Sequence, residues 1–329
     1  MSNLRAGLIG LGMMGRHHAR NLRAIDGVDL VAVADAQGDP HGVAEGLPVL
    51  PDIEALLEQK LDYVVVAAPT MYHLEIGQKI AEAGVHALIE KPLAKTYEDA
   101  QTLVKAFEDQ GLVGAVGHIE RYNPALQELR RRLEAGELGD LYQICTRRQG
   151  PFPARIADVG VIKDLASHDI DLTAWVTQRD FELVAARTMF KAGREYEDMV
   201  SATCQLNGGL MSNHLVNWLT PTKERLTIVT GEKGMFVADT LTADLTFFAN
   251  GRIVTTWDDI AQFRGVAEGD MTRFAIAKPE PLRTEHENFR DAVLGQEANI
   301  VTLAQGAQVV RVCEAMIESA ATNQFVDVR

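Results

Sequence analysis

Cysteine is scarce in this chain, which has three cysteines among 329 residues, Cys145, Cys204 and Cys313. An odd number of widely spaced cysteines favours neither a disulfide framework nor a structural zinc site. No stretch approaches the roughly 20 apolar residues of a membrane span. Residues 1–9 also lack the basic start and apolar run of a secretory signal. We therefore expect reduced thiols, a cytoplasmic location and no membrane association.

Positive charge is also in short supply. The 32 Lys and Arg residues face 46 Asp and Glu residues, which gives a net charge of −14. Such an acidic chain is a poor ligand for nucleic acid or an anionic membrane surface. The hydrophobic content of 47% and charged content of 24% are typical of a globular protein. The length predicts two domains, without internal repeats or low-complexity runs.

Aliphatic runs alternate with helical patterns in the first third of the sequence. The strand-like runs lie at 6–10, 30–35, 62–68, 86–90 and 112–118. Continuous aliphatic strands separated by helices indicate a parallel sheet that is covered on both faces. Right-handed crossovers then predict a doubly wound α/β domain of the Rossmann type over residues 1–120.

The pattern changes after residue 120. A helical segment at 124–136 precedes a strand-like segment at 140–147, and from 181 the chain is strand-rich, with turn signals at 207–209, 231–234 and 249–252. Such hairpin punctuation favours antiparallel pairing. We expect residues 121–329 to form an α+β domain with an open, largely antiparallel sheet.

A glycine-rich turn follows the first strand and precedes the first helix. It reads Gly10-Leu-Gly12-Met13-Met14-Gly15. In a dinucleotide-binding turn, the first glycine permits a tight turn, the second lets the backbone approach a pyrophosphate, and the third allows close helix–strand packing. The phosphates then meet the N-terminus of the helix. We expect these five residues to bind a dinucleotide.

Asp35 ends the second strand, 20 residues after Gly15. An acid at this position can hydrogen-bond the ribose hydroxyls of the adenosine, and its charge repels a 2′-phosphate. It therefore favours NAD, with NADP the less suitable cofactor. The alternative is an ordinary acid in a turn at a strand end.

Two further strand ends carry polar residues. The sequences APT at 68–70 and EKP at 90–92 follow the third and fourth strands. Ligands of open α/β sheets collect at the carboxyl ends of strands. The expected cofactor contacts are Pro69, Thr70, His73, Glu90 and Lys91. The alternatives are N-capping by Thr70 and a surface ion pair of Glu90 with Lys91.

Residues 160–172 read GVIKDLASHDIDL and mix apolar and ionisable side chains. In a helix, Asp164, His168 and Asp171 have the spacing i, i+4 and i+7 and lie along one stripe, beside an apolar stripe that includes Val161 and Leu172. Three interpretations are open at this point. The acids suit a helix N-terminus, Asp164 and His168 could bind a metal, or the stripe is catalytic.

Taken together, the motifs resemble the Gfo/Idh/MocA family of nicotinamide-dependent sugar and polyol oxidoreductases. The matching segments are GLGMMG, the acid at Asp35, EKP at 90–92, HIERYNP at 118–124 and DLASHDID at 164–171. They span both predicted domains. The resemblance implies a substrate that is a sugar or a sugar nucleotide, and homodimers or homotetramers built through the C-terminal sheet.

The resemblance also implies a catalytic trio of Lys91, Asp164 and His168. We expect no metal, because no HxH, HExxH or CxxC motif lies elsewhere in the sequence. Oxidation of an alcohol needs an acceptor for the hydroxyl proton, and an imidazole can serve near neutral pH. Asp164 would orient the imidazole or hold a substrate hydroxyl, and Lys91 would polarise the reacting oxygen. The sequence leaves open whether His168 or Lys91 takes the proton. Lys163 stands where related sequences often have an aliphatic residue.

Within the family, two long strings are most similar to the branch that oxidises the C3 hydroxyl of UDP-N-acetylglucosamine. They are RRQGPFPARIADVGVIKDLASHDID and NWLTPTKERLTIVTGEKGMFVADTLTADL. The resemblance places Arg121 and Asn123, from HIERYNP, in the substrate site. Inositol and glucose dehydrogenases share the catalytic trio and remain alternatives.

A UDP-sugar brings a diphosphate, which an acidic protein can bind only through local cations. Arg147, Arg155 and Lys223 are the expected contacts, since guanidinium groups suit phosphate oxygens. Neighbouring residues of a strand point to opposite faces, so only one of Arg147 and Arg148 can face the substrate. The alternative is a scatter of solvated surface charges.

Two further functions remain open. Some relatives hydrolyse N-acetylhexosaminides through transient oxidation by a retained NAD. A non-catalytic sensor of dinucleotide or sugar could use the same fold, but it would need no proton acceptor. The intact Lys91, Asp164 and His168 therefore favour an enzyme.

Overall fold

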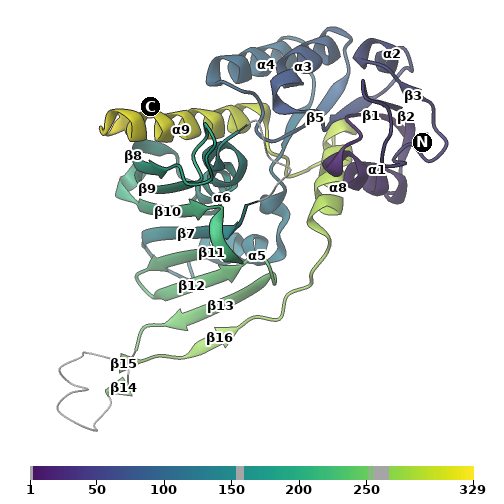
Figure 1. Ribbon diagram of the computed structural model, residues 1–329. Coiled ribbons are helices and arrows are strands. Elements are labelled where there is room, and N and C mark those ends of the chain that lie inside the picture. Colours follow the sequence, from purple (N-terminus) through teal and green to yellow (C-terminus); the bar gives the residue numbers. More distant parts are fainter. Residues whose placement is uncertain (1–2, 153–158, 252, 255–266) are drawn as a thin grey trace. The chain divides into compact units, whose positions relative to one another are not determined.

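The computed structural model describes residues 3–152, 159–251, 253–254 and 267–329. The chain divides into two compact units (Figure 1). Unit 1 comprises Met1–Tyr122 and Pro279–Glu314, and unit 2 comprises Asn123–Lys278 and Ala315–Arg329. The sequence predicts one continuous second domain over 121–329, whereas residues 279–314 cluster with the first unit.

Unit 1 contains a six-stranded sheet in the order β3-β2-β1-β4-β5-β6, in which every neighbouring pair is parallel. The strands are β1 Leu4–Ile9, β2 Val28–Ala34, β3 Val49–Leu50, β4 Tyr63–Val66, β5 His86–Glu90 and β6 Gly114–Gly117. The strand order reverses between β1 and β4, and ligands of doubly wound sheets bind at such a switch point. The predicted Rossmann architecture is confirmed.

Helices cover both faces of this sheet. They are α1 Met13–Ala24, α2 Ile53–Leu57, α3 His73–Glu82, α4 Tyr97–Asp109 and α8 Pro281–Val293, with the 3₁₀ turns η1 Thr70–Tyr72 and η2 Ile119–Tyr122. One core cluster joins Val64 and Ile89 to α3 and α4, and the other joins Val65 to Phe289 of α8. Both faces are therefore apolar, which explains the continuous aliphatic strands. Phe289 and Val301 complete these cores and bring the late segment into unit 1.

Unit 2 contains a nine-stranded sheet in the order β16-β13-β12-β11-β7-β10-β9-β8-β17. The strands are β7 Leu141–Pro151, β8 Phe181–Met189, β9 Met199–Leu206, β10 Met211–Asn217, β11 Leu219–Gly231, β12 Gly234–Asp239, β13 Asp244–Ala249, β16 Met271–Arg273 and β17 Val326–Asp327. Strands β10 and β7 pair in parallel, and the other neighbours are antiparallel. The predicted largely antiparallel sheet is confirmed.

One face of this sheet is covered and the other is open. Helices α5 Pro124–Glu134 and α6 Ser167–Thr177 pack against it, as does the π-helical turn η3 Ile162–Ala166. Along β9, buried Val200 and Ala202 alternate with exposed Ser201 and Thr203. The remaining elements are the pair β14 Ile253–Val254 and β15 Ala267–Glu268, the turn η4 Asn207–Gly209, and the helix α9 Leu303–Thr322. No helix within the described ranges combines the length and apolar character needed to cross a bilayer.

A histidine is buried in the middle of the nine-stranded sheet. His214 on β10 lies opposite Thr146 on β7. Its Nδ1 is 2.8 Å from the Thr146 hydroxyl and its Nε2 is 2.9 Å from the Ser212 hydroxyl. Burial lowers the pKa of His214 from 6.5 to about 3. The side chain is therefore neutral in the folded protein at neutral pH.

This burial predicts a loss of stability in mild acid. As the pH falls, His214 takes up a proton in the unfolded chain near pH 6.5, but in the folded protein only near pH 3. The contribution of His214 to the stability of the folded protein is therefore fully present above pH 6.5 and falls as the pH drops from 6.5 toward about 3. Between about pH 7 and about pH 5 we expect His214 to lower the free energy of unfolding by about 2 kcal/mol. Urea unfolding of the wild type and of His214→Gln at both pH values measures this. An equal pH dependence in the two proteins would contradict it.

Candidate active site

The three glycines of the turn between β1 and α1 have different surroundings. Gly10 has φ +94°, and a Cβ on it would lie 2.5 Å from the carbonyl carbon of Ala67. A Cβ on Gly15 would lie 2.0 Å from the Gly10 carbonyl oxygen, so α1 packs on the turn without side-chain space. A Cβ on Gly12 would meet no atom of the described chain within 4 Å. The open space at Gly12, at the N-terminus of α1, fits the close approach of a pyrophosphate.

Asp35 closes this turn from the end of β2. Its Oδ2 accepts the backbone N–H of Leu11 at 2.7 Å, and its Oδ1 accepts the N–H of Gln37 at 2.8 Å. Each carboxylate oxygen has a second lone pair for a further donor. Asp35 thus shapes the glycine turn in addition to its predicted contact with a ribose. Met13 and Met14 begin α1 behind the turn, and Met13 is exposed.

The EKP segment lies at the end of β5 and is no surface ion pair. Glu90 is buried, with its Oε1 at 2.9 Å from His18 Nε2 and its Oε2 accepting the backbone N–H of Lys91 at 3.0 Å. Burial would raise the pKa of Glu90, but the hydrogen bond from His18, the charge of Lys91 and the hydrogen bond from the Lys91 backbone bring it below its usual range. Glu90 therefore points into unit 1 as an anion that holds the backbone of Lys91.

His73 joins the loops after β4 and β5. Its Nδ1 lies 3.0 Å from the Pro92 carbonyl oxygen, and its Nε2 lies 2.9 Å from that of Ala68. Burial is the main reason why the pKa of His73 is lowered. Both ring nitrogens face backbone carbonyls, so the geometry gives His73 a bridging role in place of direct contact with a cofactor.

Thr70 does not act as a helix cap. The N-cap residue of η1 is Pro69 and that of α3 is Tyr72. The capping interpretation is therefore wrong. Thr70 and Pro69, at the carboxyl end of β4, remain predicted cofactor contacts.

The predicted active-site helix begins with a π turn. Residues Ile162–Ala166 are π-helical and α6 starts at Ser167, so a continuous α-helical stripe from Asp164 is wrong. Asp164 and Asp171 are buried, whereas His168 is partly exposed. Isolated π turns inside helices are frequent at functional sites. The wider turn changes the direction of Asp164 relative to the α-helical residues that follow.

Two buried contacts that the sequence did not reveal anchor this helix. The Arg148 guanidinium on β7 donates to Asp169 Oδ1 at 2.9 Å, and both side chains are buried. Glu197 accepts the N–H of Ile162 at 3.0 Å, and burial raises its pKa above the usual range. These contacts fix both ends of the segment that carries Asp164 and His168. The only sequence signal was the expectation that Arg147 and Arg148, as neighbours in a strand, point to opposite faces.

Arg121 and Asn123 both have partners within their own units. Arg121 is buried and donates to Gln305 Oε1 at 3.0 Å. The Asn123 side chain caps α5 by accepting the N–H of Ala125 at 3.0 Å and donates to the Thr240 carbonyl at 2.9 Å. The oxygen and the nitrogen of the Asn123 side-chain amide both bond within the fold, which gives Asn123 a structural role where the sequence predicts a substrate contact.

The cations predicted for a diphosphate have different environments. Arg147 lies on the open face of the sheet and pairs with Glu224 at 3.0 Å, whereas Arg148 faces α6. The sheet therefore separates Arg147 from α6, which argues against its predicted substrate role. Lys223 is exposed and passes beside Gly150. Arg155 lies outside the described residues.

The structure assembles the predicted residues in separate groups. Unit 1 brings the glycine turn together with Asp35, and Glu90 with Lys91. Unit 2 places Asp164 and His168 on consecutive turns of one helical segment. Within the described ranges, no cluster of three or more His, Cys, Asp or Glu side chains could hold a metal ion.

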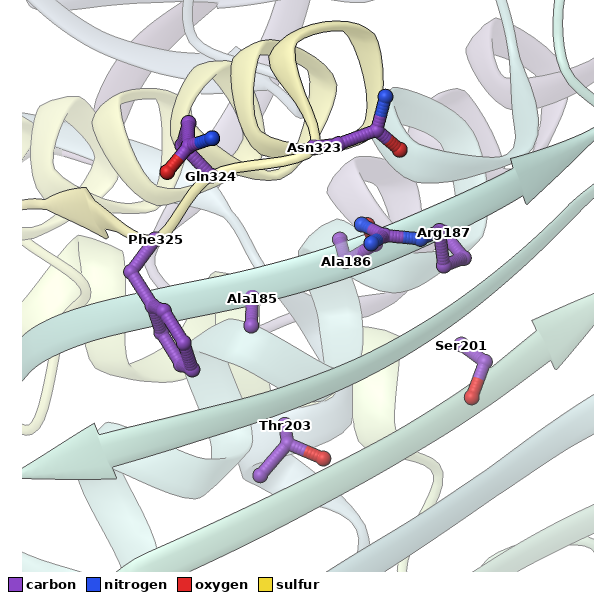
Figure 2. A pocket seen from close by; sticks show the side chains of 8 residues that line it. All are labelled: Ala185, Ala186, Arg187, Ser201, Thr203, Asn323, Gln324 and Phe325. Atoms are coloured by element: carbon purple, nitrogen blue, oxygen red, sulfur yellow. The ribbon is translucent and has the colours of Figure 1, made fainter.

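A surface hollow of about 350 Å³ lies elsewhere in unit 2 (Figure 2). It is lined by Ala185, Ala186, Arg187, Ser201, Thr203, Asn323, Gln324 and Phe325. The strand residues come from β8 and β9, at one side of the nine-stranded sheet. None of the predicted site residues contributes to this hollow.

The parallel sheet with its glycine turn defines a dinucleotide-binding oxidoreductase fold. A model described as "Oxidoreductase family, NAD-binding Rossmann fold" matches residues 4–118, and the GFO/IDH/MocA C-terminal domain matches residues 126–237. The chain belongs to the Gfo/Idh/MocA oxidoreductase family.

Two curated relatives and one solved structure are similar to the chain. A UDP-N-acetylglucosamine 3-dehydrogenase from Acidithiobacillus ferrooxidans is 36% identical over 215 residues, which cover 65% of this chain and 66% of the relative. A scyllo-inositol 2-dehydrogenase (NAD(+)) from Bacillus subtilis is 32% identical over 53% of this chain and 54% of its own. These matches span two thirds of the relatives' length or less. A crystal structure of the A. ferrooxidans enzyme aligns with a TM-score of 0.86 and 28% identity, over 98% of this chain and 99% of that one.

Proposed function

We propose that this protein oxidises a hydroxyl group of a sugar nucleotide, the C3 hydroxyl of a UDP-N-acetylhexosamine, with NAD as the hydride acceptor. The observation that carries the proposal is the glycine turn, which Asp35 closes through the N–H of Leu11 at the switch point of the parallel sheet. The DLASHDID segment supports a catalytic role, because it places Asp164 in a π turn and His168 in the first turn of α6 that follows.

NAD would be held by the glycine turn and by Asp35, and it would supply the hydride acceptor when bound. The open space at Gly12 and the remaining lone pairs of Asp35 fit its pyrophosphate and adenosine ribose. The carboxylate charge disfavours a 2′-phosphate, which is why we propose NAD over NADP. Pro69, Thr70 and the end of β5 would contribute further contacts.

The chain's own residues would then move the proton. His168 accepts the hydroxyl proton as the hydride leaves, since a partly exposed imidazole can take it and pass it to solvent. Asp164 orients the imidazole or a substrate hydroxyl, and Lys91 stabilises negative charge on the reacting oxygen. The Glu90 contact with the Lys91 backbone holds that residue at the strand end.

The substrate assignment rests on similarity to the UDP-N-acetylglucosamine 3-dehydrogenase of A. ferrooxidans, at 36% identity. Inositol is the main alternative substrate because the inositol dehydrogenase of B. subtilis is 32% identical. The resemblance also implies a homo-oligomer built through the open sheet face, where Met211, Phe248 and Met271 are exposed.

A substrate screen tests the proposal. The purified protein is incubated with NAD and, in turn, UDP-N-acetylglucosamine, UDP-N-acetylgalactosamine, N-acetylglucosamine, glucose and scyllo-inositol, and NADH is followed by absorbance. We expect net NADH formation with a UDP-sugar. Release of a free hexosamine without net NADH would identify the hydrolase. No NADH and no product with any of these substrates would contradict the proposal.

We expect Lys223→Ala to raise the Michaelis constant for a UDP-sugar by about three- to tenfold, as loss of one phosphate contact predicts. Added salt should have the same effect on the wild type, because it screens the attraction. Lys233→Ala is the matched control, since this exposed lysine binds the Gly136 carbonyl in a hairpin. Equal Michaelis constants for Lys223→Ala and the wild type would remove Lys223 from the substrate site.

A further inference from the structure

A buried chain of hydrogen bonds lies behind Lys91 in unit 1. It runs from Glu90 at the end of β5 to His18 on α1 and on to His286 on α8. His18 Nε2 lies 2.9 Å from Glu90 Oε1, and His18 Nδ1 lies 2.9 Å from His286 Nε2. The exposed fractions are 0% for His18, 1% for His286 and 8% for Glu90. At its other end, Glu90 accepts the backbone N–H of Lys91.

Each contact in this chain needs one proton between its two heavy atoms. Since Glu90 is a carboxylate, His18 must donate from Nε2. The contact between the imidazoles can then be made in two ways. Either a neutral His286 donates from Nε2 to His18 Nδ1, or a protonated His18 donates from Nδ1 to a His286 that carries its own proton on Nδ1. The two states differ by one proton, and both keep every hydrogen bond of the chain.

The surroundings of His286 select the first state. His286 Nδ1 is buried and has no hydrogen-bond partner among the described residues. A lone pair is tolerated at such a position, whereas an N–H there would be an unsatisfied buried donor, which is unfavourable. Burial and the neighbouring His18 also bring the pKa of His286 well below its usual range. His286 is therefore a neutral donor from Nε2.

Neutral donors have a consequence for the charge around Lys91. A lysine or arginine behind Glu90 would neutralise the carboxylate, whereas two neutral imidazoles hold it in place and leave its charge uncompensated from that side. Among the described residues, the ionisable groups near the chain include Lys91 beside Glu90 and Glu285 next to His286 in α8. His17 lies next to His18 and is itself influenced by Arg16, Arg20 and Glu280. The charge of Lys91 thus acts on a fixed, buried anion in the preceding residue.

We propose that His18 and His286 are positioning residues that fix the Glu90 carboxylate against the backbone of Lys91. The inference rests on the proposed catalytic function of Lys91. The chain links α1, which follows the glycine turn, to the strand end that carries the lysine, and it closes through α8 from the late segment of the sequence. Neither histidine needs to touch the substrate or the cofactor for this role.

Three variants test the role in catalysis. His286→Leu fills a similar volume but removes the donor to His18, whereas His286→Gln retains an amide N–H that can replace it. His86→Gln is the matched control, because His86 lies on the same strand as Glu90 and instead accepts the N–H of Val113. The measurements are kcat, the dissociation constant of NAD, and the pH profile of kcat, each per folded protein.

We expect His286→Leu to lower kcat about five- to twentyfold and to move the kinetic pH profile by about half a unit or more, with NAD affinity within about twofold. His286→Gln should restore most of kcat and the wild-type profile, and His86→Gln should match the wild type. A folded His286→Leu protein with the wild-type kcat and pH profile would overturn the proposal. So would a His286→Gln protein that is impaired as strongly as His286→Leu.

A second measurement uses the wild-type protein alone and does not depend on its enzymatic activity. Nitrogen-15 NMR of histidine-labelled wild-type protein reports which ring nitrogen of His286 carries the proton. We expect a neutral ring protonated on Nε2. A proton on Nδ1 would overturn the proposed chain of hydrogen bonds even if the enzyme is active. If the protein shows the expected tautomer but no dehydrogenase activity, the proposed function is wrong and the proposed chain of hydrogen bonds stands.

Discussion

Replacement of Lys91 or His168 by alanine is expected to lower turnover by about two to four orders of magnitude, the usual effect of losing an acid–base or electrostatic catalyst. Without His168 the hydroxyl proton has no positioned acceptor, and without Lys91 the charge that develops on the oxygen is not stabilised. His168 is partly exposed, so its removal leaves the buried core residues Val161 and Leu172 in place. The variants should still fold and bind NAD.

Single-turnover kinetics with saturating NAD measure this loss separately from product release. Lys95→Ala is the matched control for Lys91, because Lys95 is an exposed lysine in the same loop. Its turnover should stay within about twofold of the wild type, as expected for a surface substitution. A His168→Ala protein with near-normal turnover would assign that residue a structural role only.

Replacement of Asp35 by alanine should weaken NAD binding by about 30- to 1000-fold, which corresponds to about 2 to 4 kcal/mol. The variant loses the proposed ribose contact and also the bonds of 2.7 Å and 2.8 Å to the N–H groups of Leu11 and Gln37. The affinity for NADP should fall less, because removal of the carboxylate also removes a repulsion of the 2′-phosphate.

Isothermal titration of both cofactors measures these changes. Asp52→Ala is the control, because Asp52 caps α2 through the N–H of Ala55 and has no contact with the glycine turn. It should leave NAD affinity unchanged. If Asp35→Ala weakens NAD and NADP equally, the carboxylate shapes the turn but does not select the cofactor.

The glycine turn could be predicted because its requirements are local. Gly10 needs a positive φ and Gly15 needs the absence of a Cβ, and both follow from a strand that turns directly into a helix. The parallel pairing of the strands was also predictable, since the aliphatic runs of unit 1 are buried on both faces. Strands of the open sheet instead alternate between buried and exposed residues, as along β9.

The rest of the site depends on contacts that no local pattern specifies. His18 and His286 are separated by 268 positions in the sequence, and they meet only because α8 packs with the first unit. Glu197 reaches the start of the π turn from a loop 35 residues away. The side-chain pattern of 160–172 fits an α-helix, and it gives no sign of the π turn at Ile162–Ala166. Sequence periodicity therefore gave the correct helix but the wrong geometry at Asp164.

Isotope transfer is the most direct test of the central claim, that the protein moves a hydride from a substrate carbon to NAD. UDP-N-acetylglucosamine carrying deuterium at C3 is incubated with NAD and the wild-type protein, and the reduced nicotinamide is analysed by mass spectrometry and proton NMR. We expect deuterium at C4 of the nicotinamide and a 3-keto sugar nucleotide as the other product. Reduced cofactor without deuterium would show that another carbon is oxidised, and no reduced cofactor with this or any tested sugar would contradict the account.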